Sequence, residues 1–429
     1  MIPALVASAV HTVPDPPLPM GVFLISTVVK MIAVFTVYMV GVALLTLAER
    51  KISAWIQGRL GPNRVGGKLG LLQPAADGVK NIMKEETLPG HVNKPMFMLA
   101  PMLAFIPAML AWAVIPFGAP WDSRWGRIQM VVADLPVGFL FTLAITSLGV
   151  YGIVIAGWAS NNKYALLGGL RSTAQMISYE IAMGMSLIPV LLLAGNVTLN
   201  QIIDQQASMH MWNVLTLTIS FFIFLVAAFA ETNRLPFDLP EAESELIAGY
   251  HTEYSAMKFS MFPISEYANM ATSSALMATL FFGGWDIPFT QRDNTTGVSF
   301  FMLLLSIGIF MAKTLFFIIV FIWIRWTLPR FRYDQLMSLG WKLLLPMALA
   351  YIVIVASVIL ALDYIGLDRG FVYGLAMLGV NVILVIIAFF ILDRGRIISP
   401  AYGRATPQQI ARLRAVTAAR SHLSPQSGD

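Results

Sequence analysis

The sequence predicts an all-α, polytopic transmembrane helical bundle, and three observations support this fold class. Hydrophobic residues make up 57% of the 429 residues, and the mean hydropathy is +0.73. Both values are far above those of soluble domains. Only 12% of the residues are charged, and the hydrophobic residues gather into runs long enough for a helix to cross a bilayer. We therefore expect a multi-pass membrane protein.

Nine such runs follow one another along the chain, with boundaries that are soft by a few residues. They cover residues 21–48, 96–117, 136–158, 174–194, 212–230, 262–284, 299–324, 342–362 and 371–392. Together they define a predicted transmembrane domain over residues 21–392.

The two ends of the chain differ from this domain. Residues 1–20 are rich in proline and lack the basic segment of a signal peptide, so we expect a short external extension. Residues 393–429 form a basic tail with two open interpretations. The tail is either one basic helix near anionic lipid or a partner, or a solvated segment.

Lysine and arginine are distributed unequally between the two sides of the predicted spans. Of the 28 cationic residues, 21 lie in the connections of one side and in the tail, and 4 lie on the other side. Cations accumulate on the cytoplasmic side of membrane proteins. The sequence therefore predicts an external N-terminus and a cytoplasmic C-terminus, and it places the two long polar connections, 49–95 and 231–261, in the cytoplasm.

The composition also excludes several kinds of chemistry. The chain has no cysteine, which excludes disulfides, thiol chemistry and cysteine-ligated iron–sulfur clusters. Its five histidines all lie outside the apolar runs, so a haem held by two histidines within the bilayer is not expected. If the protein takes part in electron transfer, we expect its redox centres in partner chains. The pI near 9.3 is compatible with nucleic-acid binding, but topology explains it better, and we expect no nucleic-acid partner.

The connection 49–95 is interrupted by proline, glycine and asparagine, which impose turns. We expect Arg50, Arg59 and Arg64 on irregular backbone near the membrane surface. Farther along, apolar residues at helical spacing, with Asp77 off their stripe, predict a helix that lies in the membrane interface. The arginines have two interpretations, as topology anchors or as functional residues.

Three carboxylates lie in or at the end of apolar runs. Glu180 and Glu266 lie inside the fourth and sixth predicted spans, and Glu231 ends the fifth. A carboxylate inside a bilayer costs about 2–4 kcal/mol unless it is neutralised or hydrated. We therefore expect these groups to bind and release protons, with a neutral structural acid as the alternative. Lys313 in the seventh span would set the proton affinity of any of these acids that it contacts.

The connection 231–261 concentrates acidic residues. Asp238, Glu241, Glu243 and Glu245 fall close together, and Glu253 follows. Mutual repulsion in such a group raises the pKa of carboxyls, which suits proton handling near neutral pH. Part of this acidity is also explained by a helix that starts at the proline before Glu241, because carboxylates stabilise helix N-termini.

Several motifs resemble one known family. Ala-Glu-Thr-Asn-Arg at 230–234, Pro-Phe-Asp-Leu-Pro-Glu at 236–241 and Glu-Tyr at 253–254 are similar to the signature loop of the H subunits of proton-pumping NADH:quinone oxidoreductase, respiratory complex I. Their mitochondrial counterpart is NADH dehydrogenase subunit 1. The segments that begin at Glu49, Arg59 and Arg325 also resemble this family, and the similarity covers most of the chain.

The resemblance implies a function for the polar residues. In the family, the connection after the first span frames the tunnel through which an isoprenoid quinone, ubiquinone or menaquinone, leaves the bilayer. For this chain it implies quinone contacts at Glu49, Arg50, Arg59, Asp77 and Arg234. It implies proton relay and coupling at Glu180, Glu231, Glu266, Asp238, Glu241, Glu243, Glu245 and Glu253.

The resemblance also implies the surroundings of the chain. NADH, FMN and iron–sulfur clusters would be held by partner subunits of complex I, and this chain would bind quinone as substrate but no cofactor. The location would be a bacterial cell (inner) membrane. Two alternatives remain open: the related membrane subunit of a proton-pumping hydrogenase complex, and a stand-alone proton-coupled transporter.

Overall fold

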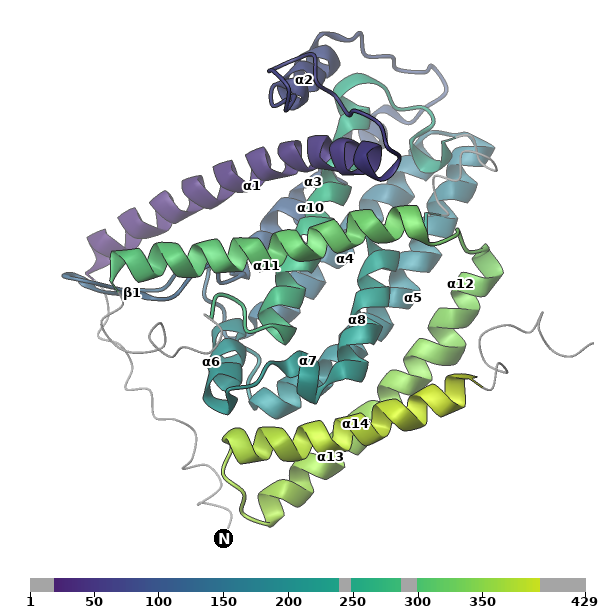
Figure 1. Cartoon of the computed structure of the whole chain (residues 1–429). Helices are drawn as coiled ribbons and strands as arrows, with labels where there is room; N and C mark the ends of the chain where they lie inside the picture. Colours follow the sequence, from purple (N-terminus) through teal and green to yellow (C-terminus); the bar gives the residue numbers. More distant parts are fainter. Residues whose placement is uncertain (1–18, 239–247, 287–298, 394–429) are drawn as a thin grey trace, which may run out of the picture. The chain divides into compact units, whose positions relative to one another are not determined.

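The computed structural model describes residues 19–238, 248–286 and 299–393, and these residues are mostly helical (Figure 1). This confirms the all-α prediction. The elements are α1 (Met20–Ile56), α2 (Gln73–Met83), α3 (Lys94–Leu110), η1 (Ala111–Val114), β1 (Trp121–Ser123), β2 (Gly126–Ile128), α4 (Gly138–Ala159), α5 (Lys163–Ala194), α6 (Leu199–Met209), α7 (Asn213–Thr216), α8 (Thr218–Glu231), η2 (Gly249–His251), α10 (Ala256–Phe281), α11 (Phe300–Thr327), α12 (Tyr333–Leu339), η3 (Gly340–Leu344), α13 (Leu345–Tyr364) and α14 (Phe371–Asp393).

Seven helices among the described residues are long and apolar enough to cross a membrane. They are α1, α3 with η1, α4, α5, α11, α12 with α13, and α14. The predicted fifth and sixth spans correspond to α8, which has only 14 residues, and to α10, which carries many buried serines and threonines. The count of nine spans and the sides of the termini therefore stay predictions.

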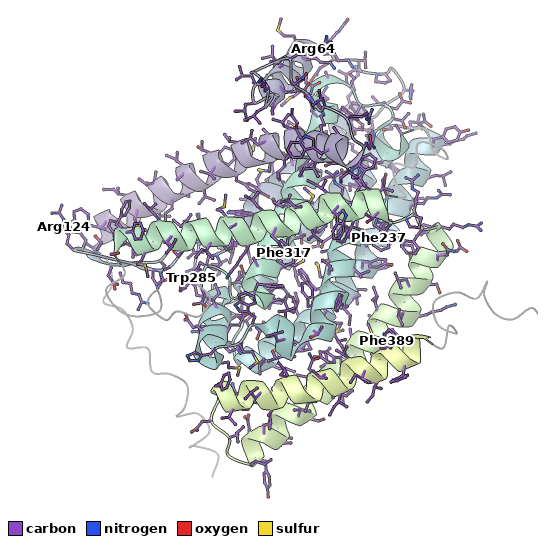
Figure 2. All side chains as sticks on the ribbon, in the orientation of Figure 1. Arg64, Arg124, Phe237, Trp285, Phe317 and Phe389 are labelled. Atoms are coloured by element: carbon purple, nitrogen blue, oxygen red, sulfur yellow. The ribbon has the colours of Figure 1, made fainter. Side chains whose placement is uncertain are left out.

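The first helix is longer than the sequence predicted. It continues to Ile56, so Glu49 and Arg50 lie on regular helix, which corrects the expectation of irregular backbone at Arg50. The reason is that the first turn-forming glycine comes only at Gly58, which has a φ of 66°. Arg59 and Arg64 do lie on irregular backbone, and Figure 2 shows Arg64 at the outer side of this connection.

The predicted interfacial helix is α2. Its apolar residues Val79, Ile82 and Met83 are all exposed in the isolated chain, which is the arrangement that a helix at a membrane surface requires.

Helices α3, α4, α5, α8 and α10 pack against one another through small residues, and they contribute the residues that line the small cavity described below. A Cβ on Gly152 of α4 would come within 2.6 Å of the Ala104 backbone nitrogen on α3. A Cβ on Gly168 of α5 would come within 2.7 Å of the Gly249 Cα in η2. The first contact brings α4 against α3 and the second brings η2 against α5, because no side chain fits between the two backbones.

The connection before α4 contains a β-hairpin that the sequence analysis missed. Strands β1 and β2 pair antiparallel, with Trp121 opposite Ile128, and Figure 2 shows Arg124 at its outer end. Each strand has only three residues, which is too short for an alternating pattern to be recognised. The Lys30 ammonium on α1 donates hydrogen bonds to the Gln129 and Val131 carbonyls at 3.0 and 2.8 Å.

Side-chain donors from three elements cap the C-terminal end of α10. Gln206 donates to the Thr279 carbonyl at 3.1 Å, and Asn213 donates to the Leu280 carbonyl at 3.0 Å. Lys313 on α11 donates to three carbonyls that follow, at 2.8–3.0 Å. The last carbonyls of a helix have no partner within the helix, and an apolar environment requires that they find one. These contacts assign Lys313 a role in capping.

Contacts divide the chain into two units, Met1–Asn381 and Val382–Asp429. Among the described residues, the second unit consists of the end of α14. The candidate site lies entirely in the first unit.

Candidate functional site

A buried ion-pair cluster joins three segments that are distant in the sequence. Glu49 on α1 accepts hydrogen bonds from Arg234, just after α8, at 3.0 and 3.2 Å. Arg325 near the end of α11 also pairs with Glu49. The Arg234 guanidinium lies 4.2 Å from the ring centre of Tyr267 on α10, within the range of a cation–π contact. We call Glu49, Arg234, Arg325 and Tyr267 the Glu49 cluster.

A second ion pair holds the interfacial helix. Arg50 on α1 contacts Asp77 on α2 at 2.7 Å, and Gln73 donates to the same carboxylate at 3.2 Å. This pair is largely exposed. The exposed Arg59 contacts Gln57, two residues away. The five predicted quinone residues are thus divided into a buried pair, an exposed pair and a separate arginine.

Four consecutive residues, 231–234, connect the Glu49 cluster to a buried carboxylate. Glu231 ends α8, and Arg234 lies three residues later. Gln175 on α5 holds this segment in place, because its amide donates to the Ala230 carbonyl at 2.8 Å and to the Asn233 side chain at 3.1 Å. Arg234 and Glu231 are therefore joined by a short, anchored stretch of backbone.

Glu231 is buried between α4 and α5. Its carboxyl lies near Thr146 of α4 and close enough to Glu180 of α5 for the two charges to interact. The sequence predicted Glu180 and Glu231 as separate relay residues, and the structure brings them together.

The residues before Glu180 determine where α5 places it. Tyr179 is fully buried and donates a hydrogen bond to the Leu336 carbonyl on α12 at 2.9 Å. Ser178 accepts a hydrogen bond from the Trp341 indole in η3 at 3.1 Å. These two contacts fix the rotation of α5 and leave Glu180 half-buried on the side of Glu231.

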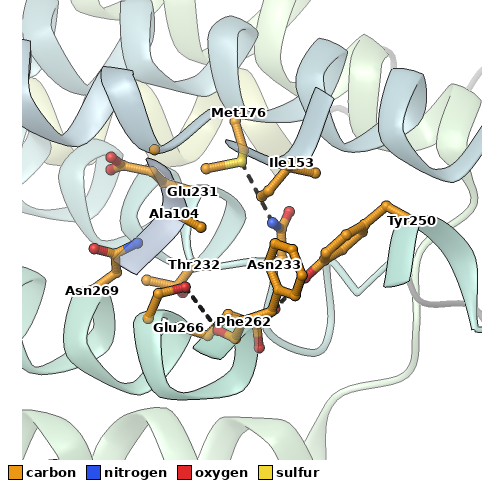
Figure 3. A pocket seen from close by; sticks show the side chains of 12 residues that line it. Ala104, Ile153, Met176, Glu231, Thr232, Asn233, Tyr250, Phe262, Glu266 and Asn269 are labelled. Atoms are coloured by element: carbon orange, nitrogen blue, oxygen red, sulfur yellow. Dashed lines mark hydrogen bonds between the residues drawn. The ribbon is translucent and has the colours of Figure 1, made fainter. Parts of the chain in front are cut away.

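Glu231 and Glu266 line the same small cavity, between α3, α4, α5 and α10 (Figure 3). Its volume is about 20 Å³, which is room for a water molecule. Glu266 accepts a hydrogen bond from the Tyr250 hydroxyl at 3.1 Å. The structure thus brings two acidic residues from α8 and α10 to one small cavity.

The remaining predicted acids have separate contacts. Asp238 pairs with Arg330, on the connection between α11 and α12, at 3.3 Å. Glu253 accepts a hydrogen bond from Asn162 at 2.8 Å. Glu241, Glu243 and Glu245 lie outside the described residues, as does the predicted helix start beside them. The described part of the chain holds no group of three or more His, Asp or Glu residues that could hold a metal ion.

Comparison with known proteins decides the family. Residues 29–356 match the NADH dehydrogenase family. The chain belongs to the NADH dehydrogenase family. It is similar to a NADH-quinone oxidoreductase H subunit of Cytophaga hutchinsonii, with 48% identity over 79% of this chain and 98% of that protein. It is also similar to the NADH-quinone oxidoreductase H subunit of Leptospira biflexa, with 51% identity over 77% of this chain and 93% of that protein.

A third relative shows the same similarity. NADH-ubiquinone oxidoreductase chain 1 of Chondrus crispus is 48% identical over 80% of this chain and 99% of that protein. These relatives confirm the resemblance given by the motifs. Together with its apolar helices, they establish this member of the NADH dehydrogenase family as a membrane subunit of an oxidoreductase complex.

Sequence reasoning missed several residues of the site in this NADH dehydrogenase family member. Arg325 was noted as a loop cation and as the start of a segment that resembles the family, but it was not assigned to the site, and Gln175, Tyr250 and Asn269 were not considered. A signal existed for Gln175 and Asn269, because buried amides in apolar helices need polar partners. Which partners they would contact was not predictable from their positions in the sequence.

Proposed function

We propose that this chain is the membrane subunit of a proton-translocating NADH:quinone oxidoreductase, in which it lines part of the quinone path and couples quinone reduction to proton movement. The other subunits would hold FMN and iron–sulfur clusters and oxidise NADH. The complex would lie in a bacterial cell membrane. The names of the relatives and the apolar helices support this proposal.

One observation carries the coupling part of the proposal. Arg234, which pairs with Glu49, and Glu231, which lies beside Glu180, belong to the same four-residue segment. The segment 231–234 therefore connects a residue proposed to contact the quinone with a residue proposed to transfer the proton.

The chemistry of the substrate explains why such a connection is useful. Reduction of a quinone consumes two electrons, supplied by partner subunits, and two protons, so the quinone site carries negative charge after the electrons arrive and before the protons do. A new negative charge near the Glu49 cluster would attract Arg234 and Arg325 and weaken their hold on Glu49. The segment 231–234 would then shift, which changes the field at Glu231 and its tendency to hold a proton.

The surrounding acids complete the proposed relay. Asp238, Glu241, Glu243, Glu245 and Glu253 would supply protons from the predicted cytoplasmic side. Glu231, Glu180 and Glu266 would pass them within the membrane domain. Glu49, Arg50, Arg59, Asp77 and Arg234 would contact or guide the quinone.

The test is Glu231→Gln in the assembled complex, reconstituted in proteoliposomes. Glutamine keeps the shape and hydrogen bonding of Glu231 but cannot carry a proton. We expect quinone reduction and proton uptake to fall together by about a hundredfold, the scale of a lost proton-transfer group. NADH oxidation by a soluble acceptor should be unchanged, since that reaction takes place in partner subunits.

The matched control is Glu85→Gln, the same chemical change on an exposed loop residue. It should retain the wild-type rate of proton uptake. A Glu231→Gln complex that assembles fully and pumps at the wild-type rate would overturn the proposed relay.

A further inference from the structure

A single buried side chain holds the stretch of chain that follows α8. Gln175 on α5 is fully buried. Its side-chain nitrogen, Nε2, lies 2.8 Å from the Ala230 carbonyl and 2.8 Å from the Phe237 carbonyl. The same nitrogen lies 3.1 Å from the side-chain oxygen of Asn233. The three acceptors come from the start, the middle and the end of residues 230–237, which we call the α8 bend.

These acceptors determine the orientation of the Gln175 amide. An amide nitrogen carries two hydrogens, and all three groups that it faces are oxygens. The opposite orientation would turn the amide oxygen toward the three acceptors, which would repel it. The amide oxygen itself has no hydrogen-bond partner among the described residues. Gln175 therefore acts on the α8 bend as a donor, and a side chain without N–H groups cannot replace it.

The backbone at the start of the α8 bend supplies only long hydrogen bonds. The Asn233 amide lies 3.4 Å from the Ala230 carbonyl. The Arg234 amide lies 3.4 Å from the Phe229 carbonyl. Both distances are longer than the roughly 2.7–3.2 Å of ordinary N–H···O bonds. Asn233 also has a φ of 50°, in the left-handed region that residues other than glycine seldom adopt. The shorter bonds from Gln175 therefore contribute much of what holds this bend in shape.

Helix α5 holds the α8 bend at further points. Asn233 Nδ2 donates to Ser172 Oγ at 3.2 Å and to Met176 Sδ at 3.5 Å (Figure 3). Ser172, Met176 and Glu180 follow one another at intervals of four residues, which places them along one side of α5. The side of α5 that holds the α8 bend is thus the side that carries Glu180.

We propose that Gln175 is the positioning residue that couples Arg234, the proposed quinone contact, to proton transfer at Glu231. This inference rests on the proposed function. The two 2.8 Å bonds of Gln175 flank Glu231 and Arg234, because one acceptor precedes Glu231 and the other follows Arg234. While the α8 bend is held, a change at Arg234 alters the surroundings of Glu231. Without the donors the bend yields locally, and quinone is reduced with fewer protons taken up.

The experiment compares Gln175→Met with a matched control, Gln206→Met, in the intact complex in proteoliposomes. Methionine has a similar length and no donor. Gln206 on α6 is also buried, and it donates to the Thr279 carbonyl at 3.1 Å and accepts from the Gly283 amide at 3.0 Å, at the far end of α10. Both changes remove buried hydrogen bonds, so both should lower the thermal midpoint.

The two variants should differ in the number of protons taken up per NADH oxidised. Gln175→Met should lower this ratio by about twofold or more, the low end of the effect of mutations in a coupling network. Gln206→Met should leave the ratio at the wild-type value. The passive proton leak of the vesicles, measured without NADH, should be equal in all samples. A merely structural residue changes the amount of assembled complex, and the ratio does not depend on that amount.

Gln175→Asn is the conservative variant. Asparagine keeps both N–H donors but withdraws them by one methylene group, so it should lower the ratio less than methionine does. If methionine prevents assembly, the asparagine variant decides the question, and a wild-type ratio in it would overturn the inference.

Hydrogen exchange gives a readout that does not depend on activity. The backbone amides of residues 232–237 should exchange about tenfold faster in the Gln175→Met complex than in the wild type, the scale expected for a lost buried hydrogen bond. Gln206→Met should leave their exchange unchanged. Wild-type exchange in Gln175→Met would show that Gln175 does not hold the α8 bend.

The outcomes separate this inference from the proposed function. A Gln175→Met complex with the wild-type ratio, or an equal loss in Gln206→Met, overturns the coupling role of Gln175 and leaves the relay standing if Glu231→Gln is inactive. Wild-type pumping in Glu231→Gln overturns the relay, and with it the coupling role of Gln175, whatever the exchange rates show for the α8 bend.

Discussion

The Glu49 carboxylate lies 3.0 Å from the Arg234 guanidinium, although 185 residues separate them in the sequence. Both side chains are buried, and Arg325 pairs with the same carboxylate. A buried charge is stable only when its partner is present, so the contact fixes the end of α1 against the segment after α8. It is also the point at which the proposed quinone path touches the chain of carboxyl groups.

Glu49→Gln should destabilise the complex. It leaves two arginines close together without their shared anion, and breaking a buried ion pair typically costs about 3–5 kcal/mol. Arg325 is partly exposed, so we expect a loss at the lower end of that range. The measurement is the thermal midpoint of the purified complex, with the exposed Arg332→Gln as a control that should change little. An unchanged midpoint in Glu49→Gln would mean that the cluster adds nothing to stability.

Glu180→Gln should allow assembly but lower quinone reduction and proton pumping together, by about a hundredfold. Glu180→Asp should retain part of both activities, because it keeps a group that can exchange a proton. A purely structural hydrogen bond predicts the opposite ranking, since glutamine preserves length better than aspartate. Rates and proton uptake in proteoliposomes, normalised to assembled complex, distinguish the two cases.

Arg59→Ala should weaken quinone-dependent turnover and inhibitor binding without affecting stability. Arg59 is exposed on irregular backbone, and its contact is with the neighbouring Gln57, so its removal leaves no buried partner. Electron transfer from NADH to a soluble acceptor should stay intact. The apparent Michaelis constant for quinone is the deciding quantity. If it does not change in a fully assembled variant, Arg59 lies outside the quinone path.

Lys313→Met should lower the thermal midpoint of the complex. The ammonium donates to the carbonyls of Phe282, Gly284 and Asp286, and each buried acceptor left without a donor costs about 1–3 kcal/mol. The exposed Lys342→Met is the matched control. Lys313→Arg should be intermediate, because its planar donors reach the carbonyls less well than an ammonium does. Equal midpoints for the Lys313 and Lys342 variants would contradict this role.

Single cysteines near His210 and near Glu243 should react with an impermeant thiol reagent from opposite sides of the membrane. The chain has no native cysteine to interfere. The intervening helix α8 has only 14 residues, about 21 Å of helix at 1.5 Å per residue, so α7 would have to contribute to the crossing. Labelling of both positions from the same side would reject the nine-span topology.

The sequence by itself determined the class of the protein and the identities of its principal charged residues. Long apolar runs can be stable only as membrane helices, so composition and run length sufficed for the all-α prediction. Glu180 and Glu266 stood out because a carboxylate in an apolar run is costly. The motifs around Arg234 and Arg325 were sufficient to indicate the family.

Only the tertiary structure decided which of these residues meet. Glu49 pairs with Arg234 and Arg325, Glu231 lies close enough to Glu180 for their charges to interact and shares a cavity with Glu266, and Lys313 donates to backbone carbonyls. The physical reason is that partner choice depends on the rotation and the axial position of each helix. These are set by the close packing of small residues such as Gly152 and Gly168, and hydropathy does not encode them. The small cavity that Glu231 and Glu266 line was likewise not predictable from the sequence.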